Sequence, residues 1–512
     1  MYHESRIKKT FLNVRINMVC YFVNLIIAFF SRKIFIDYLG AAFLGLQDTL
    51  NGLMGFLNIA ELGVGSAIGY VLYQPIFDGN KFKINEIISV LGYLYRWIGC
   101  VILLSGFVLS CFLPIIFPHT PFKIGIIYLG FYAYLFSTVL GYFANYKSML
   151  LSADQRNYEV TGFFQLVQVI KTCIQMACAY FITSFVLYFS IELAFSLVFS
   201  IILNYRVRVI YPWLNSEIRL GKSLLKKYPE ISKYIKQLFV HCISGFVQFQ
   251  LTPILIYGYV SLQMVAMYNN YTTLSNKLFN FINAILGSTY AGVGNLISEG
   301  NVQKTYELYK ELFSIRFYIA GVLSLCVYYL SSDFIKIWLG NQYVLNSLVV
   351  FLVALIFFLS IVRSVNDQFI NGFGLFYDVW APITEIIIFV LSSILFGHFY
   401  SLIGVLMGPI LSLIIIVYVW KPYFLFSKGF HLNVGKYWKM FLINLALTLA
   451  TYYIAAALVS YLFAYNITNW GQWISKAFTF FMLTSCISLV LYYYFSYGMR
   501  GFISRILSVR KI

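Results

Sequence analysis

The chain has 512 residues, of which 61% are hydrophobic and only 11% are charged, and its formal net charge is +18. This composition excludes a soluble globular protein, because apolar runs of roughly 20 residues, each able to cross a ~30 Å hydrocarbon core, recur from end to end. The positive charge indicates membrane topology and contact with anionic lipid headgroups, and it does not indicate nucleic-acid binding.

The apolar runs predict an all-α polytopic membrane protein with about 14 transmembrane helices, since the alternation of a membrane barrel is absent. The predicted spans are residues 14–35, 45–73, 88–113, 124–146, 160–183, 185–206, 238–258, 263–297, 315–335, 345–371, 377–397, 401–421, 440–463 and 474–496. The first apolar run continues directly as a full-length helix, so a cleavable signal peptide is not expected.

The distribution of Lys and Arg predicts the orientation. With both termini in the cytoplasm, 27 of the 36 basic residues lie in inner segments, five in outer segments and four within spans. The positive-inside rule therefore places both termini in the cytoplasm. The longest and most basic connection, 206–237, lies near the middle and predicts a boundary between two six-helix lobes. The predicted domains are residues 1–220, 221–430 and 431–512, the last with two additional helices and a basic tail.

A stripe of polar and small residues runs along the second predicted span. Its members fall within about 40° of one line on a helix: Gln47, Asn51, Asn58, Glu61, Gly65 and Gly69. Such a stripe is expected to face protein or a watery cavity, because amides and carboxylates are costly against acyl chains. Close helix packing with interhelical hydrogen bonds is the alternative explanation.

The same pattern recurs at an offset of 222 residues, on the eighth span. The second stripe consists of Asn269, Thr273, Asn276, Asn280, Asn283, Gly287 and Ala291. The turn Asp78-Gly79-Asn80 also recurs, as Glu299-Gly300-Asn301, and the seventh span carries Gln248 on a polar face like that of the first span. Similarity between halves is typical of transporters and predicts a pseudo-symmetric central cavity.

Charged side chains within spans are few, and each costs about 2.5–3.5 kcal/mol on insertion scales unless something compensates it. Arg363 and Asp367 stand at salt-bridge spacing on one helix face, with Glu385 as a further partner. Lys171 and Glu192 occupy similar depths on adjacent spans, and either a structural or a functional role is open for them.

The remaining charges within spans are candidates for function. Spacing assigns no partner to Arg96 or Lys277, so these two are the best cations for contact with an anionic group. Glu61 is the acidic candidate for coupling transport to H⁺ or Na⁺, and a buried structural carboxyl is the alternative. Arg32 and Asp48 lie near the outer ends of their helices, where an interfacial role also explains them.

Several stretches resemble the Wzx-type polysaccharide flippases, whose superfamily also contains multidrug and toxin extruders and lipid II flippases. They are Leu44-Gly45-Leu46, the run Ala60-Glu61-Leu62-Gly63-Val64-Gly65-Ser66-Ala67-Ile68, Ile210-Tyr211-Pro212-Trp213-Leu214, Ala291 to Ile297, Ile337-Trp338-Leu339-Gly340 and Gly374 to Pro422. The resemblance covers nearly the whole chain. It implies two lobes around a cavity lined by the first, second, seventh and eighth helices. It also implies translocation of undecaprenyl-pyrophosphate-linked oligosaccharide repeat units, as in O-antigen and lipopolysaccharide synthesis, across a bacterial inner membrane.

The predicted substrate site follows from the stripes, the charges and this resemblance. Its residues are Arg32, Asn51, Asn58, Glu61, Arg96, Lys171, Gln248, Asn269, Asn276, Lys277, Asn280 and Asn283. The cations, Arg96 and Lys277 with Lys171 or Arg32, are expected to hold the pyrophosphate, and the Asn ladder is expected to hydrogen-bond sugar hydroxyls. The expected partners are the lipid-linked oligosaccharide, membrane lipids, a polysaccharide polymerase and glycosyltransferases.

Catalysis and cofactors are not expected. The cysteines have no CxxC spacing and the five histidines are scattered, which argues against a metal site. A Walker motif is also absent, so transport is expected to use an ion gradient or the membrane potential. A multidrug antiporter of the same superfamily is the main alternative, although basic residues within spans argue against it. A membrane polymerase or ligase is rejected, because every predicted outer loop is short and none gathers a catalytic cluster.

Overall fold

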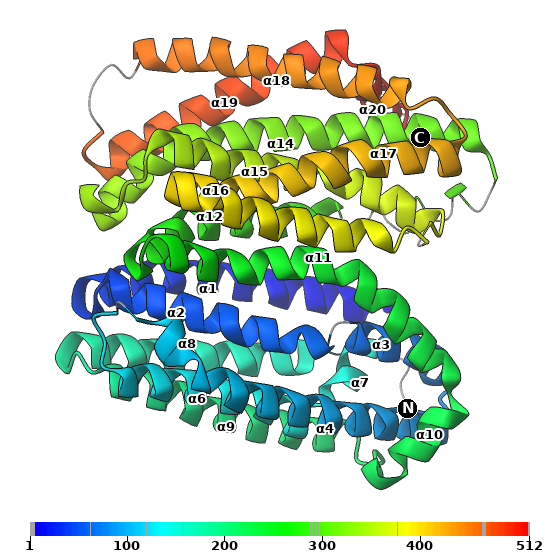
Figure 1. Cartoon of the computed structure of the whole chain (residues 1–512). Coiled ribbons are helices and arrows are strands. Elements are labelled where there is room, and N and C mark those ends of the chain that lie inside the picture. The colour runs from blue at the N-terminus through cyan, green and yellow to red at the C-terminus, as the bar shows by residue number, and fades with distance from the viewer. Residues whose placement is uncertain are drawn as a thin grey trace. The chain divides into compact units, whose positions relative to one another are not determined.

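The structure is a computed structural model, and it describes residues 6–509 except 62, 119, 155, 157, 287, 288, 290–292, 294, 295, 298, 299, 376 and 463–466. All regular elements of the described part are helical (Figure 1), which confirms the predicted fold class. Contacts divide the chain into two compact units, unit 1 (Met1–Ala266) and unit 2 (Met267–Ile512). Each unit is described by itself, and the domain boundaries predicted at residues 220 and 430 stay predictions.

Unit 1 is built from long helices joined by short ones. Its elements are α1 (Arg6–Leu39), α2 (Ala41–Leu57), η1 (Asn58–Glu61), α3 (Val64–Phe77), α4 (Lys81–Cys111), α5 (Leu113–Ile116), α6 (Ile124–Ala144), α7 (Ser148–Ala153), α8 (Tyr158–Phe181), α9 (Phe185–Ile210), η2 (Ile218–Leu220), α10 (Gly221–Lys227) and α11 (Pro229–Tyr259). Helix α1 packs against α8, α6 packs against α9 and α4, and α11 packs against α2. The helix α12 (Leu262–Leu286) begins in unit 1 and continues into unit 2.

Unit 2 is organised around its longest helix, α14. Its elements after α12 are α14 (Val302–Leu339), η3 (Asn341–Tyr343), α15 (Ser347–Gly372), α16 (Trp380–Ser412), η4 (Leu413–Trp420), α17 (Lys421–Phe424), η5 (Leu425–Phe430), α18 (Gly435–Leu462), α19 (Trp470–Phe495) and α20 (Tyr497–Val509). Helices α15, α18, α19 and α20 all contact α14. Within α16 the backbone leaves helical geometry at Tyr400 and at Ser401, whose φ is +49°. This break separates the predicted spans 377–397 and 401–421.

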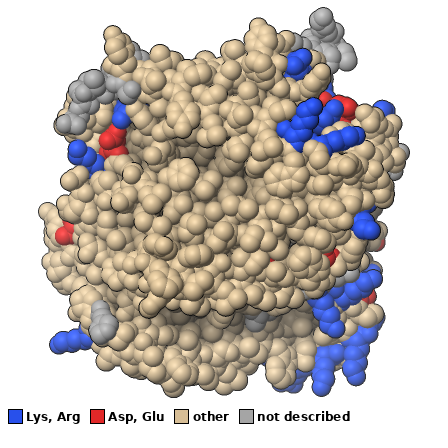
Figure 2. All heavy atoms as spheres, turned by 45° about the horizontal axis from the view of Figure 1, so that its top comes forward, with Lys and Arg blue, Asp and Glu red and all other residues tan. Residues whose placement is uncertain are grey.

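The exposed surface is that of a membrane protein. Within the described residues, nine helical segments are long and apolar enough to cross a membrane, and one of them is the segment Trp380–Phe430 that contains the break. Large apolar side chains on these helices are exposed, including Leu104 (66%) and Ile201 (69%), as expected for contact with lipid. Figure 2 shows charged side chains gathered mainly near the edges of the face drawn, with a broad middle made almost entirely of other residues.

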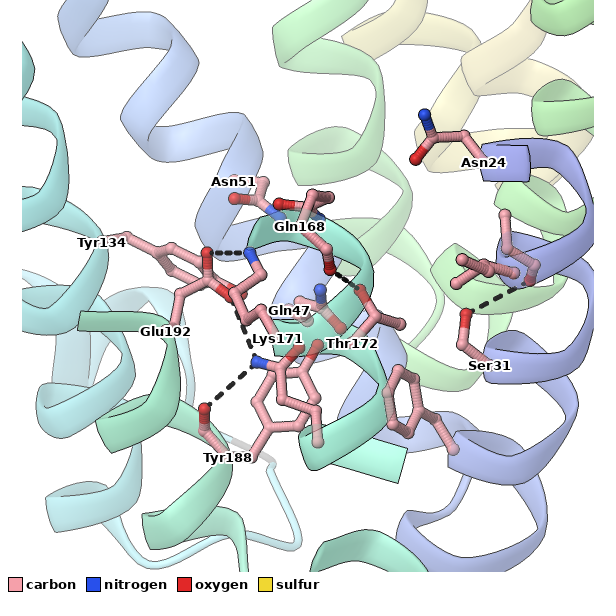
Figure 3. Close-up of a pocket in the computed structure, with 14 residues that line it drawn as sticks. Asn24, Ser31, Gln47, Asn51, Tyr134, Gln168, Lys171, Thr172, Tyr188 and Glu192 are labelled. Carbon is pink, nitrogen blue, oxygen red and sulfur yellow. Dashed lines mark hydrogen bonds and ion pairs between the residues drawn. The ribbon is translucent and has the colours of Figure 1, made fainter. Parts of the chain in front are cut away.

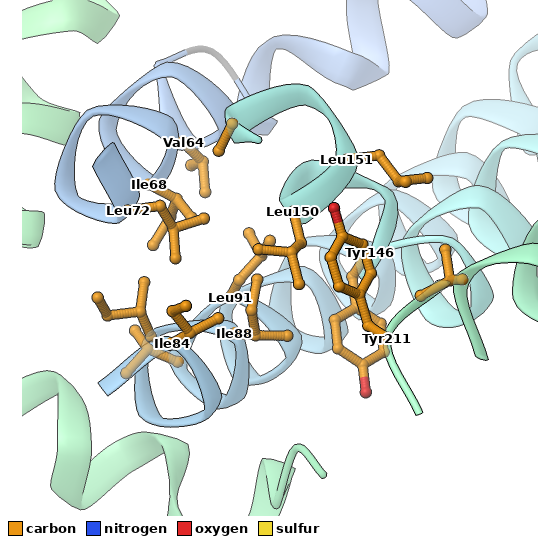
Figure 4. Close-up of a cluster of buried hydrophobic side chains, with 14 of the residues drawn as sticks. Val64, Ile68, Leu72, Ile84, Ile88, Leu91, Tyr146, Leu150, Leu151 and Tyr211 are labelled. Atoms are coloured by element: carbon orange, nitrogen blue, oxygen red, sulfur yellow. The ribbon is translucent and has the colours of Figure 1, made fainter. Parts of the chain in front are cut away.

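A cluster of buried apolar side chains holds α3, α4 and α7 together in unit 1 (Figure 4). Val64, Ile68 and Leu72 are spaced four apart and form one face of α3, opposite Ile88 on α4 and Leu150 on α7. Asn58 and Glu61 lie a few residues before α3 in the chain, so the packing of α3 in this cluster also limits where these two residues lie.

The prediction of one continuous striped helix over residues 45–73 is wrong. Helix α2 ends at Leu57, Asn58–Glu61 form a single 3₁₀ turn, and α3 begins at Val64 after Gly63, whose φ is +85°. A left-handed residue ends a helix, and glycine adopts that conformation without steric cost. Gln47 and Asn51 therefore belong to a different helix from Gly65 and Gly69, and they do not share one line with them.

The repeated turn is present in both units. Gly79 and Gly300 have φ values of +66° and +74°. In each case the following Asn caps the next helix: the Asn80 side chain accepts a 3.0 Å hydrogen bond from the Lys83 backbone N–H, and that of Asn301 accepts one of 3.0 Å from Lys304. The internal repeat read from the sequence therefore corresponds to a repeated local structure.

Candidate substrate site

Unit 1 contains a polar cavity of about 280 Å³ within its helices (Figure 3). Five helices line it: α1, α2, α6, α8 and α9. The lining residues with polar side chains are Asn24, Ser31, Gln47, Asn51, Tyr134, Gln168, Lys171, Thr172, Gln175, Tyr188 and Glu192. Asn51 and Gln168 are exposed, whereas Gln175 and Tyr188 are buried, so the cavity runs from the surface of the unit into its interior.

The two charged side chains of this cavity are paired with each other. Lys171 Nζ lies 2.7 Å from Glu192 Oε1, and Gln175 Nε2 donates to the other carboxylate oxygen at 3.1 Å and to the Tyr188 carbonyl at 3.3 Å. The pairing inferred from depth is thereby confirmed. The Lys171 charge is balanced inside the cavity, and a phosphate there would compete with Glu192 for it.

Glu61 lies in a separate hydrogen-bonded group at the break between α2 and α3. Its carboxylate accepts hydrogen bonds from the hydroxyls of Tyr95 on α4 (2.7 Å) and Tyr142 on α6 (2.6 Å). The Tyr142 hydroxyl also lies 3.1 Å from the Asn58 side-chain oxygen, so its single hydrogen is shared between the two acceptors. Asn58 and Glu61 are thus brought together, and the helices of their own unit hold them in place.

We expect Tyr142→Phe to destabilise the protein more than Tyr95→Phe does. A hydrogen bond to a charged group contributes about 1.5–3 kcal/mol, and loss of the Tyr142 hydroxyl also leaves Asn58 without its donor. Melting temperatures of the purified variants measure this, with Tyr128→Phe on the same helix α6 as the control. Equal melting temperatures for the three variants would contradict the arrangement.

Arg32 is held in a structural ion pair. Its guanidinium lies 3.3 Å from Asp48 Oδ2 and donates to the Ala266 carbonyl at 3.0 Å. Its side chain is only 14% exposed. These contacts tie α1 to α2 and to the start of α12, and they explain both charges without a ligand.

The second stripe lies on α12 as far as the structure describes it. Asn276 and Asn280 are exposed, Asn269 and Asn283 are half-buried, and Thr272 donates to the Asn269 side chain at 3.3 Å. Gly287 and Ala291 lie outside the described residues. Lys277 is half-buried. Sequence spacing assigned it no partner, whereas in the structure it interacts with another group of the chain.

The other two predicted site residues lie elsewhere in unit 1. Gln248 is half-buried on α11. Arg96 is exposed at the midpoint of α4, and within the described part of the chain it has no acidic partner. The structure therefore brings together Asn51 with Lys171, and Asn58 with Glu61, while Arg96 stands apart from both pairs.

Sequence reasoning missed much of the polar lining contributed by α8. Gln168, Lys171, Thr172 and Gln175 follow one another at spacings of three or four residues, which places them on one helix face. This polar stripe was a detectable signal. What the sequence could not show is that Gln47 of α2 and Asn24 of α1 meet it across the cavity.

Together these features define a class: an all-helical polytopic membrane fold with a polar cavity among the helices of unit 1. Two solved structures share this fold. One is described as the lipid II flippase MurJ in an inward closed conformation, with a TM-score of 0.64 and 13% identity, covering 93% of this chain and 98% of that chain. The other is a multidrug resistance MATE family transporter of the MOP superfamily in an inward-facing conformation, with a TM-score of 0.60 and 14% identity, covering 78% and 93%.

A scan of known family models and a search of curated proteins found no match. The chain therefore shares its fold with these two transporters. The superfamily expected from the sequence stays a prediction. The Wzx-type subgroup stays a prediction.

Proposed function

We propose that the protein is a flippase that moves lipid-linked oligosaccharide repeat units from the inner to the outer leaflet of a bacterial plasma membrane. The observation that carries this proposal is the fold shared with a lipid II flippase over almost the full length of both chains. Alternating access, driven by an ion gradient or the membrane potential, is the mechanism. Both termini lie in the cytoplasm. Glycosyltransferases supply the substrate, and a polymerase consumes it.

Arg96 is the residue proposed to meet the pyrophosphate. It is an exposed guanidinium halfway along α4, and a charge at the centre of a span costs about 2.5–3.5 kcal/mol unless it faces water or an anion. A pyrophosphate matches the bidentate geometry of a guanidinium. Lys277 on α12 is the second proposed contact with the pyrophosphate. Its side chain also interacts with another group of the chain.

Arg96→Ala is expected to lower export of the cell's surface polysaccharide at least tenfold at normal membrane levels, because the headgroup loses its charge-assisted hydrogen bonds. Arg96→Lys keeps the charge but loses the bidentate geometry, so its export should lie between that of wild type and that of Arg96→Ala. Lys277→Ala is expected to lower export as well. The measurement is surface polysaccharide per amount of protein in the membrane, with Lys123→Ala in an outer connection as the control.

Export at wild-type levels by both Arg96→Ala and Lys277→Ala would reject this headgroup mechanism.

The similarity to a MATE transporter supports a second candidate function, export of small molecules by the same fold. Cells that lack the protein would then lose resistance to such compounds and keep their polysaccharide. The two functions are separated by measuring both properties in one deletion strain.

A further inference from the structure

We propose that the polar cavity of unit 1 is a subsite for one neutral sugar ring of the transported oligosaccharide. This inference rests on the proposed function and adds to it a place and a chemistry for part of the substrate. It differs from the predicted division of roles, in which Lys171 or Arg32 joins Arg96 and Lys277 in holding the pyrophosphate.

The charge of the cavity favours a neutral ligand. Lys171 and Glu192 are the two ionised side chains of its lining, and they are paired at 2.7 Å. An anionic group would have to displace Glu192 from Lys171, and a cation would meet the Lys171 ammonium. Either exchange gives up a short ion pair within the membrane, where charges are poorly compensated.

The remaining lining matches hydroxyl groups. Gln47, Asn51 and Gln168 each present an amide that both donates and accepts hydrogen bonds, as a sugar hydroxyl does. The Thr172 hydroxyl donates to the backbone carbonyl of Gln168 at 2.9 Å and keeps its own lone pairs for a ligand. Figure 3 shows side chains from α1, α2, α8 and α9 gathered around one space, with the ring of Tyr188 beside them.

Gln47 supplies an acceptor that the protein leaves unused. Its Oε1 atom is buried and makes no hydrogen bond within the described part of the chain. A buried acceptor without a partner lowers stability, and such groups persist at functional sites where a ligand completes them. Gln47 lies on α2 in the cavity wall, where a ligand hydroxyl can reach it.

The size of the cavity limits the ligand to about one ring. Pockets for drug-sized ligands have volumes of about 300–1,000 Å³, and this cavity of about 280 Å³ lies just below that range. Because Asn51 and Gln168 are exposed, the rest of an oligosaccharide can remain outside while one ring enters.

The test measures binding of free sugars to the purified full-length protein by saturation-transfer NMR. The probes are D-glucose, D-galactose, L-rhamnose and N-acetyl-D-glucosamine, with D-glucuronate and inorganic pyrophosphate as charged probes. At least one neutral sugar should give a signal that falls at least fivefold in Gln47→Met and in Asn51→Leu. Gln74→Met, the same change at an exposed glutamine of α3, is the matched control and should bind like wild type.

Stability separates a binding role from a structural one. Gln47→Met should melt at or above the wild-type temperature, because it removes an unpartnered buried oxygen while keeping the side chain's shape. If Gln47→Met does not fold, the exposed Asn51 carries the test through Asn51→Leu.

Two results would overturn the subsite: neutral sugars that bind no better to wild type than to these variants, or a stronger Gln47-dependent signal from glucuronate or pyrophosphate. The outcome is independent of the headgroup experiment. Sugar binding together with normal export by Arg96→Ala would leave the subsite standing and reject the headgroup role. Loss of export in Arg96→Ala without sugar binding would reject the subsite alone.

Discussion

Asp367→Asn is expected to destabilise the protein by about 3–5 kcal/mol, since it removes one partner from a partly buried charge network. Asp367 lies 3.2 Å from Arg363 Nε and 2.6 Å from Lys421 Nζ, and Arg363 Nη1 lies 3.6 Å from Glu385 Oε1. Two cations and two anions balance in this group, and Glu385 is only 1% exposed. The substitution leaves two cations beside one carboxylate within unit 2.

The melting temperature and the monodisperse fraction of the detergent-purified protein measure this effect. Asp37→Asn is the matched control, because Lys33 and Asp37 have the same spacing of four residues but are 48% and 43% exposed. That change should cost at most about 1 kcal/mol. Adding Lys421→Met to Asp367→Asn restores the charge balance and should recover part of the loss. Equal melting temperatures for Asp367→Asn and Asp37→Asn would show that the network contributes nothing to stability.

Gly45→Ala is expected to prevent normal folding of unit 1. A Cβ atom at Gly45 would lie 1.7 Å from the backbone oxygen of Leu262 and 2.4 Å from its carbonyl carbon. A backbone atom cannot rotate away as a flexible side chain can, so α2 must move away from the start of α12. Overpacking of this kind costs about 1–3 kcal/mol or more, and the shift also disturbs the neighbouring Arg32–Asp48 ion pair.

The amount of folded protein in the membrane and its melting temperature are the measurements. Gly258→Ala on α11 is the control, because a Cβ atom there meets nothing within 4 Å. Alanine favours a helix over glycine by up to about 1 kcal/mol, so Gly258→Ala should be neutral or stabilising. Wild-type behaviour of Gly45→Ala would mean that the two helices are farther apart than the structure places them.

Local spacing predicted two ion pairs correctly, one of them in the candidate site. Arg363 and Asp367 are four residues apart on one helix, and Lys171 and Glu192 lie on consecutive spans, so the chain itself limits their possible partners. Lys421 was not predicted as a partner of Asp367, because 54 residues separate them in the sequence and its position suggested the membrane surface.

The fold class was predictable because apolar runs of span length dominate the sequence. The path of the second span was not. Helical spacing treats residues 45–73 as one straight helix, whereas α2 ends at Leu57 and α3 begins after Gly63, which has a positive φ. The glycine was visible, but its conformation depends on packing around it. The cavity was missed for the same reason: its walls come from five helices, and a spacing pattern describes only one helix at a time.

The two capped turns at Asn80 and Asn301 bear on the origin of the chain. They share a left-handed glycine, an asparagine cap and a lysine three residues later, at an offset of 221 residues. Duplication of one ancestral gene segment, followed by fusion in tandem, would leave such a pair. Since six predicted spans separate the copies, an even number, each copy would insert with the same polarity as its ancestor. A half-length ancestral polypeptide would then have worked as a homodimer, and fusion freed each copy to acquire side chains of its own.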